Sequence, residues 1–155
     1  MSNPVDTFIH PLADVEKGAV IGVGTRIWRW THVSATAQIG KDCSIGQGCY
    51  VGPGVYIRDH VRIQNNVSVF EGVYIGSHAF IGPSVVFTNV KLPKPRMKRR
   101  RLSTWVGIGA MIGANATILC GLVIGDYAVV GAGAVVTKPV PDGVTVVGNP
   151  SRRLK

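Results

Sequence analysis

The sequence predicts a single all-β domain that winds as a parallel solenoid of very short strands and tight turns. A large aliphatic or aromatic residue returns at every sixth position from Ile9 to Phe87, fourteen times without a miss. Two positions before each of these residues, from Val15 onward, stands a small or β-branched residue. A period of six fits neither the 3.6 residues of a helical turn nor a simple strand alternation. Each repeat is therefore one short strand plus one turn.

The first run of repeats covers residues 9–87. Glycine follows the large residue in many repeats, which suits a chain that bends at every unit. The large residues are Ile9, Val15, Ile21, Ile27, Val33, Ile39, Ile45, Val51, Ile57, Ile63, Val69, Ile75, Ile81 and Phe87, and the small ones run from Ala13 and Ala19 through Cys43 and Cys49 to Ala79 and Val85.

A second run begins at Val106 and continues in steps of six to Val136. The next large residue after Phe87 was expected at position 93, so about thirteen residues are inserted between the two runs. The inserted segment, about 91–104, holds Pro93, Pro95 and the run 98–101 of Lys and Arg, none of which belongs in a packed strand. We therefore expect one domain, 1–155, with a basic loop thrown out from one corner and a C-terminal tail over about 137–155.

Composition bounds the class of protein. A chain of 155 residues with 46% hydrophobic content is one folded domain by size. It starts with no basic segment followed by an apolar run and has no apolar stretch of membrane-spanning length, so we expect a cytoplasmic protein. Cys43 and Cys49 fall on the small inward position and are expected as buried thiols, whereas Cys120 receives no role. The net charge of +9, concentrated near the loop, predicts an anionic partner.

The outward face of the solenoid carries apolar side chains. The residue just before each large inward residue should point outward, and many of these are apolar or aromatic, including Tyr50, Tyr56, Tyr74, Phe80, Val86, Met111, Val123, Val129 and Val135. A monomer in water would not expose such a strip. We therefore expect copies of the chain to associate through the prism faces.

Glu71 and Asn89 are the two residues best suited to bind a reacting group. They occupy the same place in their repeats and are three repeats apart, so a solenoid with three repeats per coil stacks them about 4.8 Å apart. A carboxylate and an amide at that spacing can both reach one amino group. The alternative is structural: Asn89 caps a turn and Glu71 is a solvated surface charge.

Several longer segments resemble those of a known family. The repeat, the corner loop and the closing 147–150 segment Val-Gly-Asn-Pro are similar to the hexapeptide-repeat acyltransferases, whose fold is a trimeric left-handed parallel β-helix. More narrowly, the segments 26–30, 63–69, 82–84, 87–90 and 113–118 resemble N-acetyltransferases of nucleotide-linked 3-amino sugars. The resemblance implies transfer of acetyl from acetyl-CoA to the 3-amino group of a dTDP- or UDP-linked sugar for surface polysaccharide synthesis. It implies no metal. The basic loop could instead be a nucleic-acid patch or a solvated arm, but it holds no aromatic residue that would stack on bases, so we expect no nucleic-acid partner. We also expect no membrane insertion, because no apolar stretch is long enough to span a bilayer.

The resemblance also assigns roles to residues. Asn89 and Glu71 would hold the substrate amine, with Gln64 and Asn65 on the sugar or its diphosphate. Arg99, Arg100 and Arg101 of the loop would clamp a diphosphate, because a planar guanidinium bonds two oxygens at once. Pantetheine would lie beside Gly109, Ala110 and Ala132, and the CoA phosphates near Lys138, Arg152 and Arg153.

Two other classes use the same fold. A zinc hydratase of the γ-class carbonic anhydrase type binds its metal with three histidines, and His60 and His78, eighteen residues apart, should stack. No second histidine lies a few residues from either, so a surface pair at a corner is the preferred interpretation. A non-catalytic β-helix scaffold is the remaining alternative, and acetyl-CoA binding would separate it from the enzyme.

Overall fold

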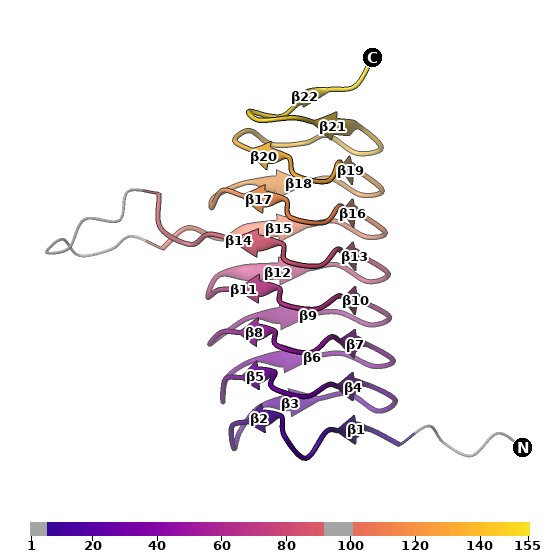
Figure 1. Cartoon of the computed structure of the whole chain (residues 1–155), viewed down its shortest axis with the longest axis vertical. Coiled ribbons are helices and arrows are strands. Elements are labelled where there is room, and N and C mark those ends of the chain that lie inside the picture. The colour runs from indigo at the N-terminus through magenta and orange to yellow at the C-terminus, as the bar shows by residue number, and fades with distance from the viewer. Residues whose placement is uncertain (1–5, 92–100) are drawn as a thin grey trace, which may run out of the picture.

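The computed structural model describes residues 6–91 and 101–155, which form 22 short strands and no helix (Figure 1). The strands stack as successive coils along one axis, and no helix in these two ranges could cross a membrane. Their bounds are β1 Phe8–Ile9, β2 Asp14–Val15, β3 Val20–Ile21, β4 Arg26–Ile27, β5 His32–Val33, β6 Gln38–Ile39, β7 Ser44–Ile45, β8 Tyr50–Val51, β9 Tyr56–Ile57, β10 Arg62–Ile63, β11 Ser68–Val69, β12 Val73–Ile75, β13 Phe80–Ile81, β14 Val86–Phe87, β15 Thr104–Val106, β16 Met111–Ile112, β17 Thr117–Ile118, β18 Val123–Ile124, β19 Val129–Val130, β20 Val135–Val136, β21 Thr145–Val147 and β22 Arg152–Arg153.

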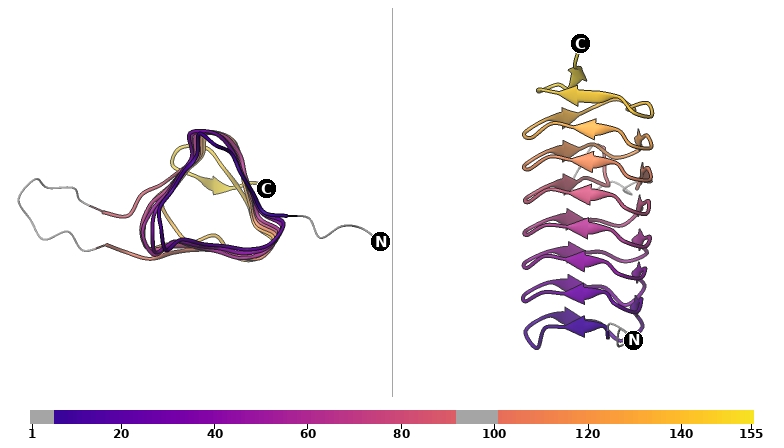
Figure 2. Two further views of the ribbon diagram at one scale, coloured as in Figure 1. Left: turned by 90° about the horizontal axis from the view of Figure 1, so that it is seen from below. Right: turned by 90° about the vertical axis from the view of Figure 1, so that its right-hand side faces the viewer.

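Every third strand joins the same sheet, so the coil is a triangular prism (Figure 2). Sheet A has the order β1-β4-β7-β10-β13-β16-β19-β21-β22, sheet B the order β2-β5-β8-β11-β14-β17-β20, and sheet C the order β18-β15-β12-β9-β6-β3. Pairing is parallel throughout the described strands except between β21 and β22. This confirms the predicted all-β parallel solenoid, the left-handed β-helix of the hexapeptide-repeat fold.

The turns fall at three kinds of corner, which we name by the sheets they connect. AB corners include 28–31, 46–49, 64–67, 82–85, 113–116 and 131–134. BC corners include 34–37, 52–55, 70–72, 88–91 with 101–103, 119–122 and 137–139. CA corners include 40–43, 58–61, 76–79, 107–110 and 125–128. Residues eighteen apart occupy the same corner in adjacent coils, and these columns determine which side chains meet.

The core is the inside of the prism. The predicted large residues from Ile27 to Phe87 and from Val106 to Val136 are buried, and Phe87 is the largest fully buried side chain. The small residues between them are buried as well, including Cys43 and Cys49, which confirms both cysteine predictions. Small and large inward side chains alternate because the inward position beside each turn has room only for a small group, whereas the inward position in each strand must fill the space along the prism axis.

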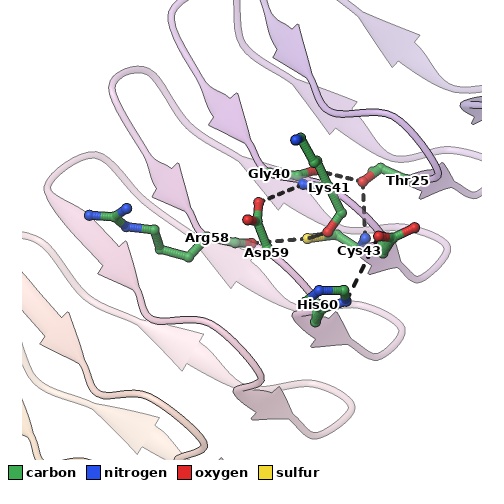
Figure 3. Close-up of polar contacts among 8 residues, drawn as sticks. Thr25, Gly40, Lys41, Cys43, Arg58, Asp59 and His60 are labelled. Atoms are coloured by element: carbon green, nitrogen blue, oxygen red, sulfur yellow. Dashed lines mark hydrogen bonds and ion pairs between the residues drawn. The ribbon is translucent and has the colours of Figure 1, made fainter.

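Side chains at the turns tie consecutive coils together (Figure 3). Thr25 Oγ1 donates to the carbonyl of Gly40 at 2.7 Å and accepts from the backbone N–H of Cys43 at 3.0 Å. The thiol of Cys43 donates to the carbonyl of Arg58 at 3.0 Å, and Asp59 Oδ1 accepts from the N–H of Lys41 at 2.8 Å. These bonds satisfy backbone groups that the tight turns leave outside the strand ladders.

The inserted loop leaves the solenoid intact on both sides. Val86 pairs with Thr117, 31 positions later, instead of the usual 18, so the insertion is thirteen residues, as predicted (31 minus 18). The chain leaves after β14 and returns before β15, and its base projects from one corner of the prism (Figures 1 and 2). Val90 and Arg101 form an antiparallel bridge at that base.

The C-terminal tail contains structure that the repeat pattern did not predict. After β20 the chain takes a shortened coil, because β21 pairs with β19 at an offset of sixteen residues (Val129 with Thr145). It then reverses into β22, which pairs antiparallel with β21 and closes the end of sheet A. Prolines and a glycine at positions 139–143 interrupt the six-residue repeat from which the earlier coils could be predicted.

The outward apolar residues lie on all three faces. Phe80, Met111 and Val129 are on sheet A, Tyr50, Val86 and Val135 on sheet B, and Tyr56, Tyr74 and Val123 on sheet C. Trp105 also belongs to sheet C, where its ring stacks on Tyr74 at 4.0 Å between centroids. Sheet C is therefore the most continuously apolar face.

Candidate active site

Glu71 and Asn89 stack at the BC corner. β11 pairs with β14 in the register Val69 with Phe87, and each residue of the pair lies two positions beyond its strand. The two residues are thus one strand spacing apart, about 4.8 Å. The next residue up the same column is Cys120, followed by Lys138, because Phe87 pairs with Ile118 and Ile118 with Val136.

The base of the loop is built around this pair. The backbone N–H of Leu102 donates to the carbonyl of Asn89 at 3.2 Å, and that of Thr104 donates to the carbonyl of Gly72 at 2.9 Å. Gly72 has a φ of +89°, a backbone conformation that favours glycine, directly after Glu71. The chain that leaves and the chain that returns are therefore both fixed where the two polar side chains emerge.

Arg101 makes an ion pair with Glu71 through its Nη1 and the carboxylate Oε2. The sequence analysis assigned Arg101 to a diphosphate clamp, and in this structure its guanidinium is instead engaged by the carboxylate. The reason is geometric, since the returning strand of the loop passes directly over the Glu71 turn. Arg99 and Arg100 lie outside the described residues.

Gln64 and Asn65 lie at an AB corner, not at the BC corner of Glu71. Asn65 Oδ1 accepts from the backbone N–H of Gln47 at 3.1 Å, so this oxygen ties two turns together in the same way as Asp59 does. The side chain of Gln64 lines two adjoining surface grooves. Within one chain, the amine-binding pair and Gln64 therefore occupy different edges of the prism.

The residues expected to bind CoA are dispersed. Lys138, Arg152 and Arg153 line one groove near the C-terminal end, together with Ser151. Ala132 is exposed at an AB corner. Gly109 lies at a CA corner, where the ring of Tyr127 would be 2.6 Å from an added Cβ.

Ala110 is wrongly assigned to CoA. Its side chain is 0% exposed, and its carbonyl accepts from the N–H of Phe80 at 2.9 Å. It occupies the small inward position of its repeat, so its methyl group faces the core and cannot contact a bound molecule.

The buried thiols are unsuited to nucleophilic chemistry. Burial raises the pKa of the Cys49 thiol to about 11, and burial likewise raises the pKa of Cys43. Both thiols therefore stay protonated near neutral pH. Cys120 is also buried, and its backbone N–H donates to Thr88 Oγ1 at 3.0 Å.

The predicted histidine stack is present at a CA corner. The rings of His60 and His78 are 4.8 Å apart and nearly parallel, and His60 Nδ1 lies 3.9 Å from Asp42 Oδ2. Across residues 6–91 and 101–155, no group of three His, Cys, Asp or Glu side chains could hold a metal ion. Within one chain, the described residues thus bring together two of the three histidines that such a zinc site uses.

Two features of the described residues were not predicted from the sequence. The Glu71–Arg101 pair depends on the return path of the loop, which no repeat encodes. The groove beside Trp28 depends on a column of residues at the AB corner, and its signal was available: Gly46 stands eighteen positions after Trp28 and eighteen before Gln64.

Chemically, the BC corner offers a carboxylate and an amide at one strand spacing, with Arg101 on one carboxylate oxygen. Such a pair can accept hydrogen bonds from a primary amine and fix its direction. The cationic groove near the C-terminal end suits phosphate groups. The arrangement fits the positioning of an amine for attack on an activated acyl group.

Comparison with known proteins agrees with this geometry. The family model described as the GMPPB C-terminal domain matches residues 29–96, and that described as bacterial transferase hexapeptide (six repeats) matches residues 103–138. The dTDP-3-amino-3,6-dideoxy-alpha-D-galactopyranose 3-N-acetyltransferase of Aneurinibacillus thermoaerophilus is 49% identical over 154 residues, covering 98% of this chain and 80% of that protein.

Two solved structures share the fold. The S84A mutant of AntD, an N-acyltransferase from Bacillus cereus in complex with dTDP-4-amino-4,6-dideoxyglucose and coenzyme A, has a TM-score of 0.71 at 20% identity, with 96% of this chain and 82% of that chain covered. PerB from Caulobacter crescentus, in complex with CoA and GDP-perosamine, has a TM-score of 0.64 at 23% identity, with 98% and 58% covered. The prism, the hexapeptide match and 49% identity over nearly the whole chain show that the protein belongs to the hexapeptide-repeat acyltransferases, a family of acetyl-CoA-dependent transferases.

Proposed function

We propose that the protein transfers acetyl from acetyl-CoA to the 3-amino group of a dTDP- or UDP-linked sugar, in the cytoplasm and for surface polysaccharide synthesis. The observation that carries the proposal is the stacked Glu71–Asn89 pair at the base of the loop. The relative at 49% identity is by its name an N-acetyltransferase of a dTDP-linked 3-amino sugar, which supports the same acceptor.

The amine is held from two sides. Asn89 offers its amide oxygen to one N–H, and Glu71 offers Oε1 to another, because Arg101 occupies Oε2. The nitrogen lone pair attacks the thioester carbonyl, the C–S bond breaks, and the nitrogen loses one proton. That proton goes to Glu71 or to the departing sulfur, and the products are an amide and free CoA.

The site is completed by a second subunit. The polar residues divide between AB corners and BC corners, which are separate edges of one prism. If sheet C of one subunit packs on sheet A of the next, with the CA corners at the threefold axis, the AB corner of one subunit adjoins the BC corner of its neighbour. The apolar residues on sheet C and on the upper part of sheet A support this homotrimer.

The donor side lies above the amine. In the AB corner the column above Gln64 is Gly82, Gly113 and Gly131. The exposed Ala132 is the next residue in the chain after Gly131, and these small residues leave an edge without large side chains for pantetheine. Lys138 lies about two coils, or 10 Å, above Asn89 and shares its groove with Arg152 and Arg153. These three cations are our candidates for binding the CoA phosphates. We no longer propose Gly109 as a CoA contact, because the ring of Tyr127 lies against it.

Free-thiol release from acetyl-CoA, measured across a panel of nucleotide amino sugars, tests the proposal. We expect turnover with a dTDP- or UDP-linked 3-amino sugar and none with the matched 3-hydroxy sugar. Acetylated product should be identified by mass. A purified, folded protein that acetylates neither nucleotide's 3-amino sugar contradicts the proposal.

A further inference from the structure

We infer that the groove beside Trp28 is the nucleobase subsite of the acceptor, with the indole as a stacking platform. This inference rests on the proposed function and extends it to residues that the amine-binding pair does not include. The groove is lined by Trp28, Arg29, Ser44, Gly46, Gln47, Ile63, Gln64 and Asn65.

The column at the AB corner creates the groove. Trp28, Gly46 and Gln64 occupy the same turn position in three successive coils, since β4 pairs with β7 and β7 with β10 in register. Gly46 adds no side chain between the other two. An added Cβ would be 2.6 Å from both Asn65 Oδ1 and the backbone carbon of Gln64, so close packing of the coils excludes one. The Trp28 and Gln64 positions are therefore two strand spacings apart, about 10 Å, with no side chain between them in this column.

Trp28 is held in place while still exposed. Its side chain is 40% exposed, its ring contacts Phe8 at 5.6 Å between centroids, and its Nε1–H donates to Ser44 Oγ at 3.4 Å. A tryptophan fixed by a neighbouring ring and an edge hydrogen bond loses little conformational entropy when a flat ligand stacks on it. Stacking of a base on an aromatic side chain is favourable for any base.

The remaining lining fits a nucleotide. Gln47 and Gln64 carry amides, which both donate and accept and can pair with the edge of a base. Arg29 supplies a cation at the same turn, suited to the phosphate that follows the nucleoside. Next to this groove, on the sheet A side, an adjoining groove is lined by Arg26, Arg62 and Asp42 together with Gln64, so its lining carries two cations and one anion.

The position along the prism axis matches the proposed reaction. Trp28 lies 43 residues before Glu71, or about 2.4 coils, which is about 11 Å along the axis. The cationic groove of Lys138, Arg152 and Arg153 is on the opposite side of the amine-binding level. An acceptor that extends from Trp28 towards Asn89 thus meets a donor that extends down from Lys138, in the trimer in which AB and BC corners adjoin.

Binding of dTDP, UDP and CoA by calorimetry tests the inference on the wild-type trimer and on Trp28→Leu. Leucine keeps an apolar contact for Phe8 but removes the flat ring. We expect the Kd of the more tightly bound nucleoside diphosphate to rise about 5- to 150-fold, with the Kd of CoA unchanged. Trp28→Phe should recover part of the loss. Trp30→Phe is the matched control, because Trp30 is 62% exposed at the same turn but outside the groove, and phenylalanine keeps a ring beside the Arg29 guanidinium.

Each other outcome has a definite meaning. Unchanged nucleoside diphosphate affinity in folded Trp28→Leu overturns the inference, and weakened CoA affinity instead would assign the groove to the adenine of the donor. Acetylation by the wild type with an unaltered KM in Trp28→Leu leaves the proposed function standing without this subsite. Nucleotide binding that depends on Trp28, without acetylation of any nucleotide amino sugar, overturns the proposed acceptor instead.

A second measurement covers the case in which Trp28→Leu does not fold. In the variant Trp30→Phe with Trp105→Phe, Trp28 is the only tryptophan, and Trp105→Phe keeps an aromatic ring on Tyr74. We expect its fluorescence to change saturably with dTDP or UDP at the concentration that calorimetry gives. Calorimetric binding without any change in Trp28 emission would overturn the inference.

Discussion

Trp105 offers the sharpest test of the proposed trimer. It lies on sheet C, 52% exposed in the single chain, with its ring stacked on Tyr74. A tryptophan covers up to about 250 Å², so about half of it, or 130 Å², remains to be buried. At about 25 cal/mol per Å² this burial contributes about 3 kcal/mol per subunit and about 10 kcal/mol per trimer.

The substitution Trp105→Glu removes that contribution and forces a carboxylate into the proposed interface, where desolvation costs several kcal/mol more per ion. We expect the variant to sediment as a monomer at micromolar concentration and to lose acetyl transfer with its trimeric mass. The matched control is Thr117→Glu, an outward position on sheet B at nearly the same height. A trimeric Trp105→Glu protein would refute the packing of sheet C at the interface, and dissociation by Thr117→Glu alone would move the interface to sheet B.

Three further predictions follow from the site and the core. Asn89→Ala should lower kcat by about 10- to 1000-fold in a folded trimer, because the amine loses its orientation. Glu71→Gln should reduce turnover severely only if Glu71 accepts the proton. If steady-state kinetics give an unchanged kcat and KM for both variants, the active site is elsewhere. Arg152→Ala should raise the KM for acetyl-CoA, with a difference that shrinks as salt rises, and should leave the KM for the nucleotide sugar unaltered; the reverse pattern would reassign Arg152 to the acceptor. The pKa of the Cys49 thiol is raised from 9.0 to about 11, so the contribution of the protonated thiol to folding stability is complete below pH 9 and disappears as the pH rises to 11. Over that window the unfolding free energy of the wild type should fall by about 2 to 3 kcal/mol more than that of Cys49→Ala, measured by urea unfolding at one protein concentration. Parallel pH profiles for the two proteins would contradict this.

Much of the fold was predictable because the repeat fixes position along the axis. A period of six with three repeats per coil places any two residues eighteen apart in one column, which is why the His60–His78 stack and the Glu71–Asn89 pairing followed from counting alone. The inserted loop was predictable for the same reason, since the interruption displaced the rhythm by thirteen positions.

The site was harder to predict than the fold, and for more than one reason. Arg101 reaches Glu71 only because the loop returns over that turn, and periodicity says nothing about the path of a loop. Ala110 was assigned to CoA although the repeat itself places it on the inward side. The division of the polar residues between two corners emerges only when each repeat is assigned to a sheet.

The central claim is that acetyl transfer takes place at a site shared by two subunits, and mixed trimers test it most directly. One partner carries Glu71→Ala with Asn89→Ala at the BC corner, and the other carries Trp28→Leu with Gln64→Ala at the AB corner. The nucleotide sugar is held well below the KM of the AB-corner variant, so that neither parent alone is active. Trimers reassembled from equal amounts should then regain about a quarter of the wild-type rate, because each site draws one intact corner from each of two neighbours with a probability of about one half. Mixed trimers that are no more active than either parent would contradict the shared site.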